Sequence, residues 1–383
     1  MHLFISAGEP SGDLHGSNLI RHLHARNPGL QVVGFGGDKM TAAGAKLLFP
    51  LTSLAVMWVG QVLRNIRTFF RLADDAEAYF RDHRPDAVVL IDYPGFHWHL
   101  AKRAKKHGIP VYYFVPPQLW AWAGWRVKKM RACVKKVLTA LPFEDDWYRA
   151  RGVDTHYVGH PYFDELRSQR LDLPFVEALK RDTVVGILPG SRNQEVTKNA
   201  PMMLAAAKRI HERLPNVKFH VAAFKPAHAE LVSGMAEKIG VPVEVHVGRT
   251  PEIIEASAMA LSVSGSVSLE LLTRTTPAII VYRVGAFGWF LARKIFMTVK
   301  SISLPNLLAG EALFPEFLTF RDQSAEIAGQ ALQWLTDESQ RQSVVKRLTA
   351  LRDRCAIPGA CERAADFLTR ELAGASPAIR KAA

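Results

Sequence analysis

The chain has 383 residues, 48% of them hydrophobic and 22% charged, which excludes a largely disordered protein. At about 100–200 residues per domain, this length predicts two globular domains rather than one. The formal net charge of +13 favours a polyanionic partner, such as nucleic acid, an anionic membrane face or a phosphorylated substrate.

Short apolar runs alternate with amphipathic helical patterns along the whole chain. Most runs are continuous rather than alternating, which predicts strands buried on both faces of a parallel sheet. Helical patterns such as residues 73–82 and 200–213 lie between them, so βα repetition is expected. The expected strands, in chain order, are residues 3–7, 32–35, 87–91, 110–114, 136–140, 184–188, 218–223, 243–247, 259–263 and 278–282.

This pattern restarts after a polar, irregular stretch at residues 161–181. Each half therefore opens with a strand, a glycine-containing turn and a helix, as nucleotide-binding α/β domains do. We predict an α/β fold of two Rossmann-like domains, at residues 1–165 and 166–350. Residues 351–383 are expected to form a helical tail.

The first turn that could carry chemistry follows the first strand, at residues 6–16. Its glycines let backbone N–H groups approach a ligand, and its acidic side chains suit sugar hydroxyls better than phosphate. The alternative is an ordinary βα turn in which Asp13 is a cap. The candidate ligand-binding residues here are Glu9, Ser11, Gly12, Asp13 and His15.

Asp92 ends the buried run at 87–91, where catalytic groups of α/β proteins collect. A carboxylate there can take a proton from an attacking hydroxyl, so Asp92 is the candidate general base. His15 is the rival base. The alternative is that Asp92 only caps the segment that follows.

Two turns in the second half are candidate phosphate sites. Gly190, Ser191 and Arg192 join a strand to a helix, where a guanidinium adds a bidentate donor to an anion-binding helix end. The alternative is a surface pair between Arg192 and Glu195.

The other turn contains Ser264, Gly265 and Ser266, with Glu270 placed to accept hydrogen bonds from ribose. The alternative is an N-capped helix whose dipole Glu270 favours. No DxD-type pair follows a strand, so we expect no metal and no cofactor; Arg192 and backbone N–H groups would stabilise a leaving diphosphate.

Apolar and basic side chains also recur together at helical spacing. Val62, Leu63, Ile66, Phe69 and Phe70 form a stripe beside Arg64, Arg67 and Arg71, a pattern typical of membrane-surface helices. A buried amphipathic helix with a solvated basic face is the alternative. Trp289 and Phe290 lie in a second such stretch, and residues 116–129 mix three tryptophans with cations, which suits a lipid interface or stacking on single-stranded nucleic acid.

Targeting and redox features are sparse. Cys133, Cys355 and Cys361 form no disulfide framework and fit no zinc pattern, so we expect reduced thiols. No secretory signal and no long uncharged apolar run is visible. We therefore expect a cytoplasmic protein, in which any contact with a membrane is peripheral.

Six segments in order resemble the lipid-A-disaccharide synthases, over nearly the whole chain. They are residues 7–13 (AGEPSGD), 91–96 (IDYPGF), 120–122 (WAW), 141–144 (LPFE), 188–192 (LPGSR) and 303–310 (SLPNLLAG).

The resemblance implies a glycosyltransferase-B fold whose second domain holds the UDP-sugar, with the acceptor at the first. It implies transfer from UDP-2,3-diacylglucosamine to 2,3-diacylglucosamine 1-phosphate, giving lipid A disaccharide 1-phosphate and UDP. Asp92 matches the family's base, Arg192 its diphosphate-binding arginine and Asn306 its donor-site asparagine. A homodimer that exchanges the tail after Cys355 is also implied, as is peripheral contact with the anionic, cytoplasmic face of a bacterial inner membrane.

Two other functions stay open on the sequence. A UDP-N-acetylglucosamine 2-epimerase, or another soluble UDP-sugar enzyme, can use the same fold. A basic nucleic-acid binder would show salt-sensitive affinity for oligonucleotides, but no recognised nucleic-acid module appears, so we expect no nucleic-acid partner.

Overall fold

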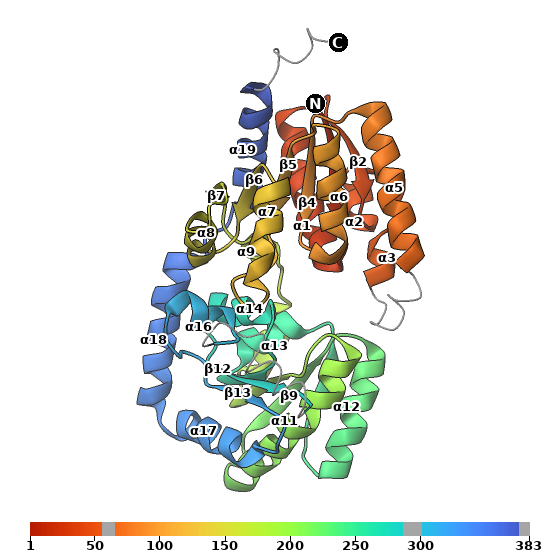
Figure 1. The fold of residues 1–383 in the computed structure, drawn as a ribbon. Coiled ribbons are helices and arrows are strands. Elements are labelled where there is room, and N and C mark those ends of the chain that lie inside the picture. The colour runs from red at the N-terminus through yellow and green to blue at the C-terminus, as the bar shows by residue number, and fades with distance from the viewer. Residues whose placement is uncertain (56–65, 286–300, 375–383) are drawn as a thin grey trace. The chain divides into compact units, whose positions relative to one another are not determined.

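The computed structural model describes residues 1–55, 66–285 and 301–374. The chain divides into two compact units (Figure 1), unit 1 with Met1–Asp164 and Ile357–Ala383 and unit 2 with Glu165–Ala356. Of the residues predicted to contact a membrane, Val62, Leu63, Trp289 and Phe290 lie outside the described residues. No helix within the described ranges combines the length and apolar character needed to cross a bilayer.

Unit 1 contains a seven-stranded parallel sheet in the order β3-β2-β1-β4-β5-β6-β7. Strand order reverses between β1 and β4, which pair with Ala7 opposite Ile91. The strands are β1 (His2–Ala7), β2 (Gln31–Phe35), β3 (Lys46–Phe49), β4 (Ala87–Ile91), β5 (Val111–Phe114), β6 (Lys136–Thr139) and β7 (Thr155–Tyr157).

Helices cover both faces of this sheet, because both faces of β1 and β4 are apolar. One core layer includes Leu3 and Ile5 with α1 and α19, and the other includes Phe4 with α5 and α6. The helices are α1 (Pro10–Arg26), α2 (Asp38–Ala42), α3 (Thr52–Ala55), α5 (Ile66–His83), α6 (Pro94–Lys106), η1 (Gly124–Arg126), α7 (Val127–Cys133), α8 (Pro142–Arg149) and α19 (Ala360–Gly374), with α9 (Tyr162–Ser168) at the boundary.

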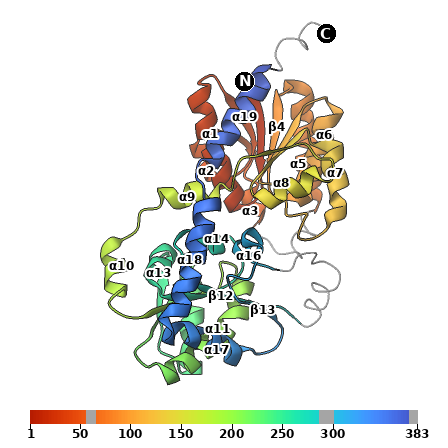
Figure 2. The ribbon, with the colours of Figure 1, turned by 90° about the vertical axis from the view of Figure 1, so that its left-hand side faces the viewer.

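The C-terminal segment returns to unit 1, where α19 packs along α1 (Figure 2). Asp164 anchors its start, because its carboxylate accepts hydrogen bonds from the backbone N–H groups of Ala360 and Cys361, at 3.1 and 2.9 Å. Arg26 of α1 pairs with Glu362. The preceding helix ends only at Cys355, so the predicted tail boundary at residue 351 falls inside a helix. Exchange of the tail between two copies stays a prediction.

Unit 2 contains a six-stranded parallel sheet in the order β10-β9-β8-β11-β12-β13. Order reverses between β8 and β11, where Leu188 pairs with Ser262. The strands are β8 (Val184–Leu188), β9 (Lys218–Ala223), β10 (Glu244–Val247), β11 (Met259–Ser262), β12 (Ala278–Arg283) and β13 (Glu316–Thr319). The helices are α10 (Leu173–Leu179), α11 (Asn193–Arg213), α12 (Pro226–Ile239), α13 (Thr250–Ala256), α14 (Val267–Thr273), α16 (Leu304–Ala309), α17 (Ser324–Thr336) and α18 (Glu338–Cys355).

The predicted α/β class and two-sheet architecture are confirmed. Strands β4, β8 and β9 begin and end where the sequence predicts. Three short strands were missed, namely β3, β7 and β13, and each lies at the edge of a sheet.

Candidate active site

Each unit places two of the predicted turns side by side at its strand-order reversal. In unit 1 the turns after β1 and β4 are neighbours because Ala7 pairs with Ile91. In unit 2 the turns after β8 and β11 are neighbours, and the backbone N–H of Val263 donates to the carbonyl of Leu188 at 3.1 Å. Ligands of open α/β sheets bind at such points, outside the carboxyl ends of the strands.

The turn that contains Asp92 has an unusual backbone. Asp92 and Tyr93 both adopt positive φ angles, 48° and 50°, in the left-handed region that non-glycine residues avoid. Two such residues together cost about 1–3 kcal/mol each, so the surrounding structure must stabilise them. The Tyr93 ring packs onto Gly8, where a Cβ would lie 2.2 Å from a ring carbon, so only glycine fits there.

Buried side chains bind the backbone of this turn. The Tyr113 hydroxyl and a ring nitrogen of His97 both contact the carbonyl oxygen of Asp92 at 2.6 Å, and Ser6 contacts the other His97 nitrogen at 2.9 Å. None of the three was a predicted site residue, although Ser6 opens the predicted turn at 6–16. Their signal was weak: His97 follows Asp92 by five residues, on the first turns of α6.

The glycine-rich turn after β1 divides its predicted residues between two roles. Glu9 is half-buried beside Tyr93, whose pKa is raised by burial and then by the Glu9 charge. Ser11 is exposed, and Gly12 approaches the carbonyl of Ile91. These residues are placed to line the carboxyl edge of the sheet.

Asp13 instead stabilises a distant segment. Its carboxylate accepts hydrogen bonds from the backbone N–H groups of Gly37, Lys39 and Met40, at 2.8, 3.1 and 3.1 Å. It therefore caps the N-terminus of α2 and not its own helix. In this arrangement its oxygen atoms are committed to the backbone.

His15 is buried beside His160, and burial lowers the pKa of His15 to about 3 and that of His160 to about 4. Both rings are therefore neutral at pH 7. A histidine with so low a pKa is a weak base, since proton uptake from an acceptor hydroxyl follows the basicity of the group.

In unit 2, Glu195 shapes the turn at Gly190–Arg192. Its carboxylate accepts hydrogen bonds from the backbone N–H groups of Ser191 and Arg192, at 3.1 and 3.2 Å. Gly190 has φ of 121°, and a Cβ there would lie 2.6 Å from the Glu195 Cβ. The Arg192 guanidinium lies 3.7 Å from Glu195 and its side chain is 73% exposed, so the alternative pair forms while the cation stays accessible.

The neighbouring turn is joined to the segment 302–316. The Ser264 hydroxyl donates to the carbonyl of Ile302 at 2.7 Å. Gly265 and Ser266 are exposed at the start of α14. Glu270 is buried and pairs with Arg274 at 3.2 Å. It therefore forms an ion pair within α14 in addition to lying in the first turn of that helix.

Asn306 is buried and uses both ends of its amide. Its Nδ2 donates to the carbonyl of Phe314 and to Glu316, at 2.7 and 2.8 Å. Its Oδ1 accepts from the backbone N–H groups of Leu313 and Phe314, at 2.9 and 2.8 Å. An amide offers two donors and two lone pairs, so this side chain is saturated and holds the segment in shape.

An apolar pocket of about 330 Å³ adjoins the Asp92 turn. Ile66 and Phe70, 45% and 48% exposed, stand at the start of α5. The pKa of His99 is lowered by burial and then by the charges of Arg103, Lys102 and Lys129, so basic side chains lie near His99 on this wall of the pocket. Its lining comprises Ile66, Phe69, Phe70, Tyr93, Gly95, Phe96 and His99.

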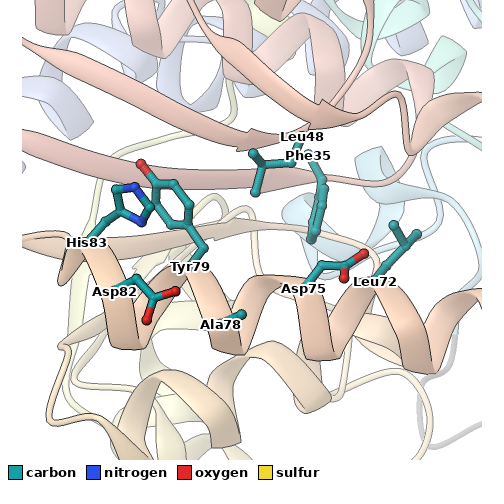
Figure 3. Close-up of a pocket in the computed structure, with 8 residues that line it drawn as sticks. All are labelled: Phe35, Leu48, Leu72, Asp75, Ala78, Tyr79, Asp82 and His83. Atoms are coloured by element: carbon teal, nitrogen blue, oxygen red, sulfur yellow. The ribbon is translucent and has the colours of Figure 1, made fainter.

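A second pocket, of about 340 Å³, lies between the sheet edge and α5 (Figure 3). Phe35 and Leu48 face the helix, and Tyr79 stacks on His83 with ring centroids 4.2 Å apart. None of its residues was predicted as a site residue.

One cluster among the described residues has metal-ligand chemistry: His220, Glu244 and His246, on β9 and β10. The two imidazoles contact each other at 3.0 Å and each lies 3.9 Å from the carboxylate. His220 pairs with Gly186 in the middle of β8, so the cluster lies alongside the strands and not on the turns that follow β8 and β11.

Comparisons with known proteins match one family over nearly the whole chain. The model of the lipid-A-disaccharide synthetase family matches residues 3–368. Lipid-A-disaccharide synthase of Syntrophus aciditrophicus (strain SB) is 35% identical over 367 residues, covering 95% of this chain and 96% of the relative. That of Myxococcus xanthus (strain DK1622) is 34% identical, covering 97% of each.

Solved structures of low identity share the fold. A putative UDP-N-acetylglucosamine 2-epimerase from Listeria monocytogenes has a TM-score of 0.68 at 13% identity, covering 98% of this chain and 97% of that one. The calicheamicin glycosyltransferase CalG4 has a TM-score of 0.61 at 15% identity, covering 98% and 99%. These two show the architecture alone.

Proposed function

The chain belongs to the lipid-A-disaccharide synthase family, and on that basis we propose that it is an inverting glycosyltransferase of lipid A biosynthesis. The donor is UDP-2,3-diacylglucosamine and the acceptor is 2,3-diacylglucosamine 1-phosphate. The products are lipid A disaccharide 1-phosphate and UDP.

The observation that carries this choice of substrates is the apolar pocket beside the Asp92 turn. Tyr93 and Gly95 belong both to that turn and to the pocket wall. An acyl chain in the pocket would therefore bring its sugar close to the proposed base. A 2-epimerase acting on a water-soluble UDP-sugar would have no use for such a wall.

The proposed reaction assigns the acceptor to the carboxyl edge of the sheet in unit 1 and the donor to that of unit 2. Asp92 takes the proton of the acceptor hydroxyl while the oxygen of that hydroxyl bonds to the anomeric carbon of the donor. The bond from that carbon to the UDP oxygen breaks, and its electron pair leaves with UDP. Arg192, with the backbone N–H groups at 264–266, would stabilise the negative charge that develops on the diphosphate.

Membrane association forms part of the proposal. The substrates carry acyl chains, and the exposed Ile66 and Phe70 stand near the basic residues around His99. An apolar patch flanked by cations fits the surface of an anionic bilayer. We propose peripheral contact at the cytoplasmic face of the inner membrane.

The direct test is an assay of the purified protein with the two diacylated substrates in detergent micelles. We expect disaccharide and UDP in equal amounts. Asp92→Asn is nearly isosteric and removes only the basicity, so turnover should fall by roughly 100-fold or more with UDP binding unchanged. Epimerisation of UDP-N-acetylglucosamine without disaccharide would refute the proposal. Full turnover in Asp92→Asn with collapse in His15→Ala would move the base to His15.

A further inference from the structure

The carbonyl oxygen of Asp92 accepts two hydrogen bonds from fully buried side chains. The Tyr113 hydroxyl and His97 Nδ1 lie on different elements, β5 and α6, and each is 2.6 Å from this oxygen. On the other side of the peptide, the Asp92 N–H donates to the carbonyl of Val115 at 3.2 Å. The backbone of the proposed base is thus bound at both its donor and its acceptor.

The direction of each hydrogen bond can be assigned. Burial lowers the pKa of His97 to about 3, so its ring is neutral and carries one N–H. A carbonyl oxygen only accepts, so that proton is on Nδ1. Nε2 then has a lone pair, and the Ser6 hydroxyl donates to it at 2.9 Å. The Asp92 carbonyl thereby selects the tautomer of His97, and the Ser6 hydroxyl holds the ring in the orientation that binds it.

We propose that Ser6, His97 and Tyr113 are positioning residues for glycosyl transfer, which hold Asp92 in its left-handed conformation and so fix the direction of its side chain. The inference rests on the proposed function, since it assumes that Asp92 is the base. Without the two hydrogen bonds, the turn loses what offsets the cost of its backbone angles, φ of 48° at Asp92 and 50° at Tyr93.

Such positioning matters because proton transfer depends on reach. A general base works within about 2.6–3.2 Å of the proton donor, and a misplacement of about 1 Å can cost on the order of 100-fold in rate. A relaxed Asp92 backbone would swing the carboxylate away from the acceptor hydroxyl. The donor nucleotide, assigned to unit 2, would bind as before.

Tyr113→Phe tests this inference because it removes one hydroxyl and keeps the aromatic ring. We expect kcat to fall by about 10-fold or more, with the KM for the UDP-sugar changed by less than about twofold. Tyr112→Phe is the matched control, because Tyr112 is also buried on β5 but belongs to the opposite core layer, with α1 and α19. It should leave kcat unchanged at a comparable thermal stability.

A double-mutant cycle separates positioning from general stability. If Tyr113 acts through the basicity of Asp92, Tyr113→Phe should have little further effect on kcat in the Asp92→Asn background. The inference would be overturned if Tyr113→Phe lowered kcat by the same factor in the wild-type and Asp92→Asn backgrounds, or if Tyr112→Phe lowered kcat as much as Tyr113→Phe does. If the wild type makes the disaccharide, full activity of Tyr113→Phe or of Asp92→Asn would also overturn the inference. A wild type that makes none would refute the proposed function itself.

A rescue experiment addresses His97. The amide nitrogen of asparagine reaches nearly the position of Nδ1, so His97→Asn keeps a donor to the Asp92 carbonyl. We expect it to retain several-fold more kcat than His97→Leu, which has no donor. Equal activity of the two folded variants would exclude a role for that hydrogen bond.

Discussion

Arg192 and Glu195 carry opposite charges in one turn, and their side chains have different roles. Glu195 binds the backbone N–H groups of Ser191 and Arg192 and so shapes the start of α11. The Arg192 guanidinium, 3.7 Å from this carboxylate, is mostly exposed. An exposed ion pair contributes little to stability, so the cation can turn to a diphosphate at small cost.

Arg192→Ala should therefore weaken UDP binding without unfolding unit 2. Loss of a hydrogen bond to a charged group costs about 1.5–3 kcal/mol, which is roughly a 10- to 150-fold increase in the dissociation constant. Calorimetric titration with UDP measures it. Arg347→Ala is the control, since Arg347 pairs with Glu311 on the surface of the same unit. An unchanged UDP affinity in Arg192→Ala would remove this residue from the donor site.

Some residue roles could not be read from the sequence because their partners are distant. Asp13 looks like a ligand-binding or local capping residue, yet it caps α2 more than 20 residues away. Asn306 binds residues 313–316 across a loop. Local patterns predicted which turns carry candidate residues at the ends of strands, but hydrogen-bond partners of single side chains depend on tertiary packing.

At the scale of elements, the sequence predicted the buried strands and missed three short strands at sheet edges. Central strands such as β4 and β8 are covered on both faces and read as continuous apolar runs. The edge strands β3, β7 and β13 are only partly buried and include charged or polar residues, so they carry no such run. Periodicity also predicted a helix at 73–82, which is the C-terminal part of α5.

The exposed start of α5 is the surface that we predict to contact a membrane. Ile66→Ser combined with Phe70→Ser should reduce co-sedimentation with anionic vesicles, because each loses roughly 1.5–3 kcal/mol of apolar burial in the bilayer surface. Both side chains are about half exposed, so the fold should survive. Leu173→Ser, 63% exposed in unit 2, is the control. Unchanged vesicle binding would assign this helix face to packing alone.

At the scale of the whole molecule, unit 1 gathers buried groups whose protonation opposes or favours folding. His15, His97 and His160 have pKa values lowered by burial to about 3, 3 and 4. Glu144 has its pKa raised by burial to about 7, while its carboxylate accepts from Trp120 Nε1 at 3.0 Å and Ala140 N at 3.0 Å. The histidines stay neutral in the folded state at pH values where the unfolded chain protonates them.

These shifts predict the pH dependence of stability with a definite sign. Below about pH 6.5 the unfolded state binds three more protons at the histidines, which lowers stability as pH falls. Between about pH 7 and 4.5 the folded state binds one more at Glu144, which partly offsets the loss. For these four groups, the net of two protons gives a decline of at most about 2.7 kcal/mol per pH unit between pH 6.5 and 4.5. Urea unfolding of the wild type at several pH values, followed by tryptophan fluorescence, measures this slope.

Glu144→Gln tests the assignment, because it keeps an acceptor for Trp120 but removes the titrating carboxylate. Without the offset, three protons remain, and the decline should steepen to about 4 kcal/mol per pH unit over the same range. Because the two units can unfold separately, the transition of unit 1 should be the one that moves. A stability that is flat from pH 7 to 5, or the same slope in Glu144→Gln as in the wild type, would show that these buried groups do not govern the acid sensitivity of unit 1.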